Sequence, residues 1–574
     1  MYITYANRSQ EERELEHLSA FSLSGIKSLK DTKKTVEGCK LHRLLSFWSA
    51  EGRKVTDNFE DLGLEDSWGN QGARTERFGQ VGSMPVRKYF PFASVEEPSG
   101  VCWTVNFEAP YSWQTEVFVI NGCATLAGGL ADYDFGHWKK KIAAGQTFTT
   151  RRAFFSVDYG FESTCANLVD FYNRRLKVPE SEEHLPVICN EYCTTYGNPD
   201  ANRVKKLARK AKDLGAEYFI IDAGWYKKPG INWCYSIGDW QESEEFFPSG
   251  LKNLVSYIKD LGLRPGIWFE YENCAIDSEI YHKTDWLLKR NRIPINDKYR
   301  RFFELRKQEV KDYIDEKVFR FLADTGFEYI KVDYNGNYGR GCDGAESEGE
   351  AGRQVAEESM ALYEKLARAV PGLVIENCAS GGHRLEPARM QMASMASFSD
   401  AHECIEVPVI AANVSRIIPR RQNQIWATLK NTYSENRFYN LLLGNFYGRL
   451  CLSGDFDILM PRQEEICREC ISFYKELAPL LKDGRLVSLE STVARYRNPK
   501  GIQLGIIKHS NQKLLLLHTF GDSKGGEIEY SGSIAKSMGS VPFHTEQRCG
   551  KRFIVYEKQD FGALAILLDE GDQG

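Results

Sequence analysis

Five acidic side chains follow short apolar runs in the middle of the chain, where each run would end if it formed a strand. They are Asp222, Glu270, Asp333, Glu376 and Asp400. Such a set suits acid–base or nucleophilic chemistry, because one carboxylate can attack or accept a proton while a second carboxyl group donates one. Trp225 and Trp268 lie close to these positions in the sequence, and their flat rings could stack on the faces of a sugar.

Each of these residues also has a purely structural interpretation. Asp222 precedes Ala-Gly and could cap a turn, while Asp400 could cap a helix that follows it. Asp333 could pair with Lys331, which lies two residues earlier on the same face of a strand. The two tryptophans could be core residues. Residue type alone therefore leaves the choice between function and structure open.

Metal and phosphate motifs are absent from the sequence. His383 and His402 do not have the H-E-x-x-H spacing of a zinc helix, and Gly381–Gly382 is not followed by the Lys-Ser/Thr of a phosphate loop. Cys467 and Cys470 form a single C-x-x-C in a helix-like stretch, without the second pair that a zinc site needs. We therefore expect no metal and no cofactor.

The alternation of strand-like and helical segments in the middle of the chain indicates how these acids would be positioned. Eight short runs read as buried strands: 186–189, 218–223, 265–270, 329–334, 373–377, 396–400, 415–418 and 450–453. Helical patterns separate most of them. Eight strands with helices between them, within about 300 residues, predict a (β/α)8 TIM barrel, in which active sites lie at the C-terminal ends of the strands.

The flanking regions have a different pattern, in which short β-like runs alternate with turns. We predict a multidomain protein with an N-terminal β-sandwich over residues 1–162 and a helical linker over 163–184. The catalytic barrel would span residues 185–484, and a small antiparallel β-sandwich would follow over 485–574.

Composition excludes several classes of protein. The 574 residues carry a net charge of −5, which argues against nucleic acid as a partner. No run approaches the ~18 apolar residues of a membrane span, and the polar N-terminus does not resemble a signal peptide. The 15 cysteines are scattered singly, as is typical of a reducing compartment. We expect a cytoplasmic protein without a membrane partner.

Several motifs carry a family resemblance. IIDAGW, GDW, FPSGLK, GIWFE, YIKVDYN and ENCASGG followed by SFSDAHE resemble glycoside hydrolase family 36, which contains the retaining α-galactosidases and α-N-acetylgalactosaminidases of the melibiase clan. The motifs occur in the order found in the family, over residues 185–454. The resemblance implies the same barrel, flanked by β-sandwiches, and a carbohydrate substrate.

The resemblance also implies roles for individual residues. Asp333 resembles the nucleophile and Asp400 the general acid/base of a retaining glycosidase, whose two carboxyl groups stand about 5–5.5 Å apart. The substrate-binding residues that it implies are Asp222, Trp225, Trp268, Lys331, Asn335, Cys378, Ser380, Gly381 and Arg306. For the last of these the alignment with the family is ambiguous between Arg306 and Lys307.

This sequence departs from the pattern of the family at several positions. Ala223 replaces the second acid of an Asp-Asp pair, and Ala401 stands where an acid is common. These small residues favour an exo-acting enzyme that releases terminal α-linked N-acetylgalactosamine, with an α-galactosidase or a galactosyl transglycosylase as the alternative. A catalytically silent sugar-binding relative is the alternative of another class, against which the presence of both Asp333 and Asp400 argues.

The family implies that homo-oligomers are common and that N-terminal loops can reach the site of a neighbouring subunit. The aromatic and basic stretch 68–87 is our candidate for such a contact.

Overall fold

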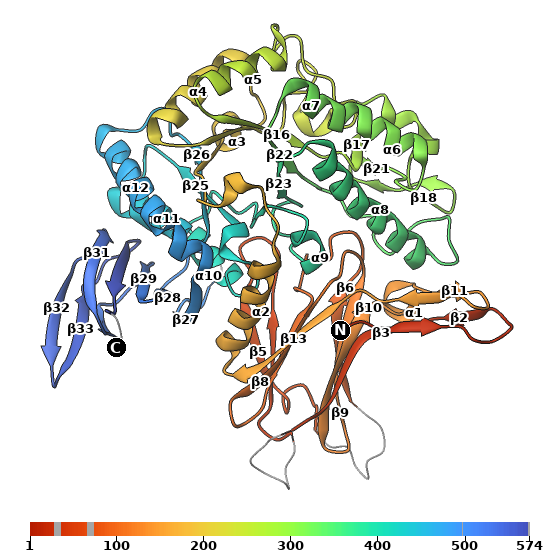
Figure 1. Ribbon diagram of the computed structural model, residues 1–574, viewed down its shortest axis with the longest axis horizontal. Helices are drawn as coiled ribbons and strands as arrows, with labels where there is room; N and C mark the ends of the chain where they lie inside the picture. The colour runs from red at the N-terminus through yellow and green to blue at the C-terminus, as the bar shows by residue number, and fades with distance from the viewer. Residues whose placement is uncertain (28–35, 66–73, 496, 572–574) are drawn as a thin grey trace.

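The computed structural model describes the whole chain except residues 28–35, 66–73, 496 and 572–574. A barrel carries N-terminal sheets below it and a separate pair of C-terminal sheets at its lower left in the view of Figure 1. The predicted fold class, a TIM barrel with antiparallel β domains on either side, is confirmed.

Eight parallel strands close the barrel. In order around it they are β14 (Ile188–Asn190), β15 (Tyr218–Ile221), β16 (Arg264–Phe269), β22 (Tyr329–Val332), β23 (Val374–Asn377), β24 (Met395–Ser397), β25 (Asn423–Leu429) and β26 (Arg449–Gly454). The last strand pairs with the first, with Ile188 opposite Cys451. All four residues of β15 are buried, as expected for a strand that is covered on both faces.

The prediction for the seventh strand was wrong. Residues 415–418 follow the end of helix α10 (Val407–Val414), and the strand is β25 instead. Polar residues concealed β25 in the sequence, because they are buried inside the barrel and bond to one another. Gln424 Nε2 donates to the Tyr329 hydroxyl at 3.0 Å, and Trp426 Nε1 donates to Gln424 Oε1 at 3.1 Å.

Helices cover the outside of the barrel. They are α4 (Ala201–Leu214), α5 (Gly250–Asp260), α6 (Gln308–Ile314), the π-helix η6 (Asp315–Arg320), α7 (Phe321–Thr325), α8 (Glu348–Ala369), α9 (Pro387–Met390), α10, α11 (Glu435–Gly444) and α12 (Pro461–Asp483). Local sequence explains their ends. Asp200 caps α4 by accepting from the N–H groups of Asn202 and Arg203, and Gly215 ends it with φ 98°.

Short elements fill the loops of the barrel. They are α3 (Tyr192–Thr195), β17 (Asn273–Ala275), β18 (Lys289–Arg290), β19 (Ile293–Pro294), β20 (Asn296–Asp297), β21 (Arg300–Phe302) and the 3-10 turns η2 (Glu180–Glu182), η3 (Trp233–Tyr235), η4 (Ile280–His282), η5 (Thr284–Trp286), η7 (Arg420–Gln422) and η8 (Asn445–Tyr447).

Two antiparallel sheets form the body of the N-terminal domain. One contains β3 (Ser19–Ile26), β10 (Cys123–Leu130), β9 (Trp113–Ile120) and β6 (Thr75–Gln80); the other contains β13 (Ala153–Tyr159), β8 (Val101–Phe107), β7 (Phe92–Glu96), β4 (Lys40–Leu44) and β5 (Lys54–Asn58). Buried rings such as Phe21, Phe107 and Trp113 join their inner faces into one core.

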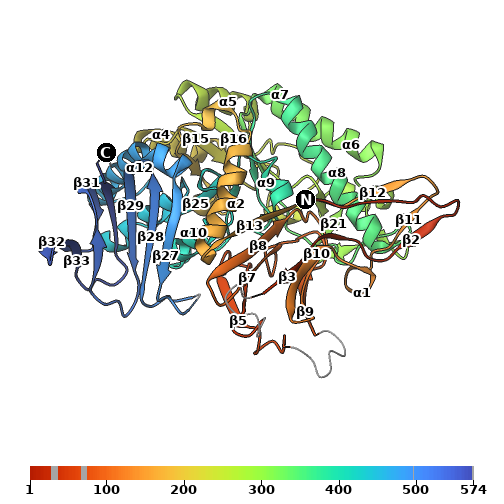
Figure 2. The same ribbon diagram turned by 60° about the horizontal axis from the view of Figure 1, so that its bottom comes forward.

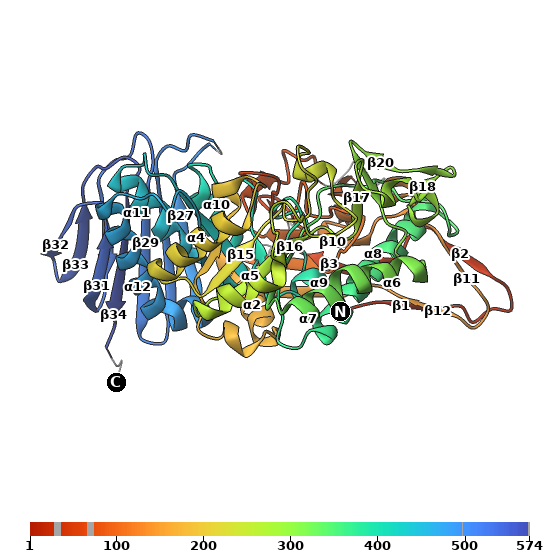
Figure 3. The same cartoon turned by 90° about the horizontal axis from the view of Figure 1, so that it is seen from above.

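Two-stranded arms extend from this domain. They pair β1 (Thr4–Ala6) with β12 (Thr147–Thr149), and β2 (Arg13–Leu15) with β11 (Lys140–Ile142), close to the short helix α1 (Tyr133–Gly136). Figure 3 shows both arms at the opposite end of the molecule from the C-terminal sheets.

Helix α2 (Phe161–Arg175) leads from the N-terminal sheets to the barrel. The C-terminal domain has a sheet of β27 (Arg485–Ser491), β28 (Ile502–His509), β29 (Gln512–Thr519), β34 (Ala563–Asp569) and β31 (Ser533–Gly539), and a second sheet of β30 (Gly526–Tyr530), β33 (Lys551–Tyr556) and β32 (Phe543–Arg548). Figure 2 shows the larger sheet side by side with the barrel helices α10 and α12.

Three further expectations concern the whole chain. The 15 cysteines are all free, and Cys467 and Cys470 are buried in α12. None of the helices that the structure describes is both long and apolar enough to cross a membrane.

Of the candidate contact stretch 68–87, residues 68–73 lie outside the described residues. In the remainder, Phe78 is buried and Arg77 pairs with Glu116 at 2.8 Å, so a contact with a neighbouring subunit stays a prediction.

Candidate active site

A cavity of about 460 Å³ opens at the C-terminal ends of the barrel strands. Six of the residues that the sequence nominated line it: Asp222, Trp268, Lys331, Asp333, Asn335 and Asp400. They come from four different strand ends and were brought together by closure of the barrel.

Asp333 follows β22 and accepts four hydrogen bonds. Its Oδ1 accepts from the backbone N–H groups of Tyr334 at 2.7 Å and Ser380 at 3.2 Å. Its Oδ2 accepts from Asn335 Nδ2 at 2.7 Å and Trp268 Nε1 at 3.2 Å. All four donors are N–H groups, which fix the orientation of the carboxyl group and suit its acceptor-only carboxylate form.

The turn after β23 brings Asp333 and Asp400 to the same place. Ser380 has φ 44° and Gly381 has φ 79°, a left-handed conformation that turns the Ser380 N–H toward Asp333. A Cβ atom on Gly381 would stand 2.4 Å from the backbone nitrogen of Asp400. Glycine is therefore required at this position for the turn after β23 to pack against the backbone of Asp400, three residues after the end of β24.

Asp400 faces the cavity, where solvent reaches it. The surrounding protein replaces much of the water around its carboxyl group, and the negative charge of Asp333 adds to this effect. Together they raise the pKa of Asp400 to about 7, against the opposing influence of the Lys331 cation. A carboxyl group with such a pKa can donate a proton near neutral pH and recover it later.

Asp222 and Lys331 form a buried ion pair at the floor of the cavity. Lys331 Nζ lies 3.0 Å from Asp222 Oδ2, which also accepts from Asn190 Nδ2 at 2.7 Å. Burial on its own would lower the pKa of Lys331, but the charges of Asp222 and of nearby acidic groups raise it well above its usual value. Lys331 also lies over the ring of Trp426, 4.6 Å from its centroid.

Glu270 and Glu376 support the site from below. Glu270 accepts from Asn335 Nδ2 at 2.9 Å and pairs with Arg300 Nε at 2.9 Å, so it holds the side chain that in turn bonds to Asp333. Glu376 lies inside the barrel, where it accepts from the hydroxyls of Tyr329 and Ser397.

Trp225 and Arg306 are not among the residues that line the cavity. Trp225 is fully buried, donates from Nε1 to the Trp268 carbonyl at 2.9 Å and stacks on Phe321 at 5.4 Å. Arg306 pairs with Glu304 at 2.6 Å and donates to the carbonyl of residue 343 at 2.7 Å. Their sequence-based assignment as sugar contacts is corrected accordingly: they fix the wall and a loop.

Cys378 is buried at the start of the turn that carries Ser380 and Gly381. Burial and the charge of Asp333 raise the pKa of its thiol well above the usual value, so it remains a neutral thiol.

The sequence did not assign a sugar contact to any of the other residues that line the cavity. The additional lining residues are Trp48, Ser49, Tyr192, Tyr196, Ala223, Trp233, Ala401, His402, Glu403, Cys404 and Arg497. Trp48 and Ser49 belong to the N-terminal domain, and Trp48 Nε1 donates to the Ser380 carbonyl at 2.9 Å. Arg497 follows β27 of the C-terminal domain. Such contacts depend on how separate domains pack together, for which the local sequence carries no periodic signal.

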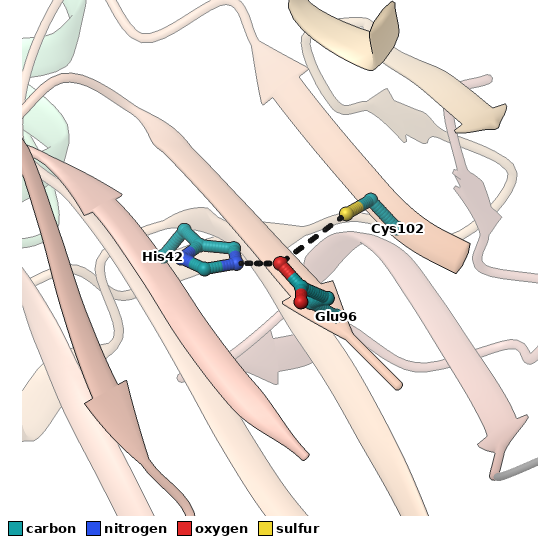
Figure 4. Close-up of side chains that lie close together, drawn as sticks. All are labelled: His42, Glu96 and Cys102. Atoms are coloured by element: carbon teal, nitrogen blue, oxygen red, sulfur yellow. Dashed lines mark hydrogen bonds and ion pairs between the residues drawn. The ribbon is translucent and has the colours of Figure 1, made fainter. Parts of the chain in front are cut away.

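One group of potential metal ligands occurs in the described part of the chain, and it lies in the N-terminal domain. His42, Glu96 and Cys102 point toward one another from neighbouring strands (Figure 4). His42 Nε2 lies 2.8 Å from Glu96 Oε2, which pairs through its other oxygen with Lys40 at 3.5 Å. Burial and the positive charge of Lys54 lower the pKa of His42 to about 4. Two lysines beside the cluster disfavour a bound cation, and we interpret it as a hydrogen-bonded packing element.

Comparison with known proteins places this geometry in a family. The melibiase family model matches residues 147–483, which is more than half of the chain and includes every barrel strand. This chain belongs to the melibiase family. Membership confirms the family that the motifs around Asp333 and Asp400 resemble.

Curated relatives in this family carry the name α-galactosidase. α-Galactosidase Mel36A of Lactobacillus acidophilus is 25% identical over 381 residues, an alignment that covers 64% of this chain and 51% of the relative. α-Galactosidase AgaA of Geobacillus stearothermophilus is 24% identical over 383 residues, covering 64% and 52%. This chain thus spans about half the length of the curated relatives it matches.

The crystal structure of AgaA superimposes on this melibiase-family chain with a TM-score of 0.82 at 18% identity, covering 99% of this chain and 78% of AgaA. This similarity extends the shared fold beyond the barrel to the sheets on both sides.

Proposed function

We propose that this protein is a retaining, exo-acting α-galactosidase. The observation that carries the proposal is the pair of carboxyl groups in one cavity: Asp333, held by four N–H donors, and Asp400, whose pKa is raised to about 7. An ionised nucleophile and a protonated acid are the two states that double displacement requires at the start of the reaction.

The first step forms a glycosyl-enzyme. An Asp333 oxygen attacks the anomeric carbon of the α-linked galactose, and the bond from that carbon to the glycosidic oxygen breaks. Asp400 gives its proton to the departing oxygen, so the aglycone leaves as a neutral alcohol. The product is a β-linked galactosyl ester of Asp333 and an ionised Asp400.

The second step restores the enzyme. Asp400 accepts a proton from an incoming water, whose oxygen attacks the anomeric carbon from the face that the aglycone left. The ester bond to Asp333 breaks, galactose departs with its α configuration retained, and both carboxyl groups return to their initial states. In each step Trp268 and Asn335 keep Asp333 oriented toward the anomeric carbon.

The floor of the cavity offers both hydrogen-bond acceptors and hydrogen-bond donors to sugar hydroxyls. Asp222 supplies acceptor oxygens and Lys331 supplies N–H donors, and the two neutralise each other, which suits an uncharged sugar. Trp268 provides an apolar ring beside them. The floor is closed by the barrel interior, and a closed floor accepts a terminal residue rather than the middle of a glycan.

An α-N-acetylgalactosaminidase is the second candidate, because Ala223 lines the cavity beside Asp222 and leaves space where the family pattern has an acid. The sequence favoured this activity, but the relatives support α-galactosidase more strongly, since both named above carry that name.

Parallel rate measurements on nitrophenyl α-galactoside, α-N-acetylgalactosaminide and α-galactosaminide test the proposal. Raffinose is added as a natural α-galactoside, because the structure of an AgaA variant has been solved in complex with it. We expect kcat/KM to be highest on the α-galactoside. A higher value on the α-N-acetylgalactosaminide would select the second candidate. Binding of either sugar without turnover, seen as a raised melting temperature, would indicate a silent relative.

A further inference from the structure

A turn of the N-terminal domain closes over one side of the active site. Residues 45–53 join β4 to β5 and reach the end of the barrel that carries Asp400. Trp48 Nε1 donates to the Ser380 carbonyl at 2.9 Å, and the Ser49 hydroxyl donates to Glu406 Oε1 at 2.6 Å. Both partners belong to the barrel, so two hydrogen bonds attach this turn beside the catalytic turn of β23.

The backbone of the same turn is pressed against the barrel in a left-handed conformation. Phe47 has φ 78° and Ser49 has φ 69°, values that non-glycine residues rarely adopt. A Cβ atom on Gly52 would stand 2.5 Å from the carbonyl carbon of Asn413 in α10. Strain of this kind persists only where surrounding contacts enforce it, and it is concentrated at functional sites.

Glu51 is the residue that this turn places deepest. It is 0% exposed. A Cβ atom on Gly382 would lie 3.4 Å from its Cγ, which places the carboxyl group between the turn after β23 and the turn after β24. The hydroxyl of Ser399, the neighbour of Asp400, opposes the effect of burial and lowers the pKa of Glu51. Neither Glu51 oxygen makes a well-formed hydrogen bond to any residue that the structure describes.

The chemistry of this location favours a neutral carboxyl group. Burial, and to a smaller extent the negative charge of Asp400, raise the pKa of Glu51 to about 8. At neutral pH, Glu51 therefore carries a proton, and it can donate it in a hydrogen bond without placing a second anion beside Asp400.

We propose that Glu51 is a positioning residue for Asp400, through which the N-terminal domain fixes the general acid/base. The proposal rests on the function proposed above, in which Asp400 is that acid/base. Glu51 is not among the described residues that line the cavity. It therefore acts through Ser399 and Asp400 rather than on the substrate.

Several charges already act on Asp400. Asp333, Asp222 and Glu376 oppose its ionisation, and Lys331 favours it. Loss of the proton from Glu51 at alkaline pH would add one more negative charge near Asp400. Since a neighbouring anion opposes ionisation, the two carboxyl groups titrate as a pair, and ionisation of either one makes the other lose its proton less readily.

Two substitutions test the positioning role. Glu51→Ala removes the support, and we expect kcat/KM to fall about tenfold or more on galactosides with poor leaving groups but less than threefold on activated dinitrophenyl galactosides, which need no protonation. Glu51→Gln keeps the shape but cannot ionise, so we expect the alkaline limb of its kcat/KM profile to move to lower pH by about half a unit.

Glu386→Gln is the matched control. Glu386 is also a buried glutamate at the contact between the N-terminal domain and the barrel, where it accepts from the Ala109 N–H at 3.0 Å. We expect this variant to lower stability without a dependence on leaving group. Equal losses of rate on both substrate types in Glu51→Ala, together with an unmoved pH profile in Glu51→Gln, would overturn the proposal.

A readout that needs no turnover separates this inference from the proposed function. Hydrogen exchange of the backbone over residues 395–405 should rise at least threefold in Glu51→Ala, rise less in Glu51→Gln, which keeps the shape of the side chain, and stay unchanged in Glu386→Gln. An inactive wild type with this exchange pattern would defeat the proposed function alone. Unchanged exchange in an active enzyme would defeat the positioning role alone.

Discussion

Lys331 Nζ lies 3.0 Å from Asp222 Oδ2 in a buried ion pair that joins two barrel strands at the floor of the cavity. In the sequence, Lys331 suggested a partner for Asp333, two residues away on the same strand. Closure of the barrel pairs Lys331 with Asp222 instead, 109 residues earlier in the chain. The Asp333 carboxyl group accepts hydrogen bonds from N–H donors.

Removal of this cation should be costly. Lys331→Met leaves the Asp222 carboxylate buried without its partner, and we expect a loss of about 3–5 kcal/mol in the free energy of unfolding. Urea denaturation measures it. The double variant Lys331→Met/Asp222→Asn, which removes both charges, should recover part of the loss. Additive losses in that double-mutant cycle would show that the pair is not coupled.

Asp400→Ala should affect substrates according to their leaving groups. Poor leaving groups need a proton from Asp400, so their hydrolysis should slow by about 10²–10⁴-fold, whereas galactosylation by dinitrophenyl substrates should change far less. Steady-state and burst kinetics with both substrates measure the difference. A loss that is equal for both would refute the acid/base role.

Gly381 should tolerate no side chain. Gly381→Ala forces a Cβ atom to within 2.4 Å of the Asp400 nitrogen, and we expect kcat/KM to fall at least about 100-fold as the two carboxyl groups move apart. Gly372→Ala is the control, because Gly372 has φ 78° and open space around its Cβ position. That variant should lose about 1 kcal/mol of stability and no activity. Similar activity losses in both variants would assign the effect to backbone strain alone.

Acid should destabilise the fold through buried histidines. Burial lowers the pKa of His518 from its usual 6.5 to about 3. Between these values the unfolded chain binds a proton that the folded chain does not. Stability should therefore decrease as pH falls from 6.5, by about 1.4 kcal/mol per pH unit for this residue.

His518→Leu should reduce that dependence, and its unfolding free energy should fall about 2 kcal/mol less than that of wild type between pH 6.5 and pH 5. His544→Gln, at an exposed position, is the control and should follow wild type. Parallel curves for wild type and His518→Leu would contradict the assignment.

Much of the barrel could be predicted because its strands are short apolar runs and the acids that line its cavity follow these runs closely. Asp333 and Asp400 are evident for that reason. β25 escaped prediction because it contains buried polar residues, for which hydrophobicity gives no signal. Gln424 bonds to Tyr329 inside the barrel, whereas Asn423 Nδ2 donates to the Ala411 carbonyl of α10 on the other face of the strand, at 3.2 Å.

The rest of the site could not be predicted from local patterns. Trp225 resembles a cavity wall by its position after a strand, but Phe321 and Trp268 enclose it. Trp48 and Glu51 come from a turn of another domain, and their relation to Asp400 exists only after the domains pack together. Proximity of this kind leaves no period or spacing in the sequence.

The most direct test of the account is to trap the glycosyl-enzyme. An activated fluorinated galactoside forms the galactosyl ester quickly and releases it slowly, and mass spectrometry of the digested protein then locates the sugar. We predict one adduct, on the peptide that contains Asp333, and no adduct in Asp333→Ala. A sugar attached to another carboxylate, or steady turnover by Asp333→Ala, would contradict it.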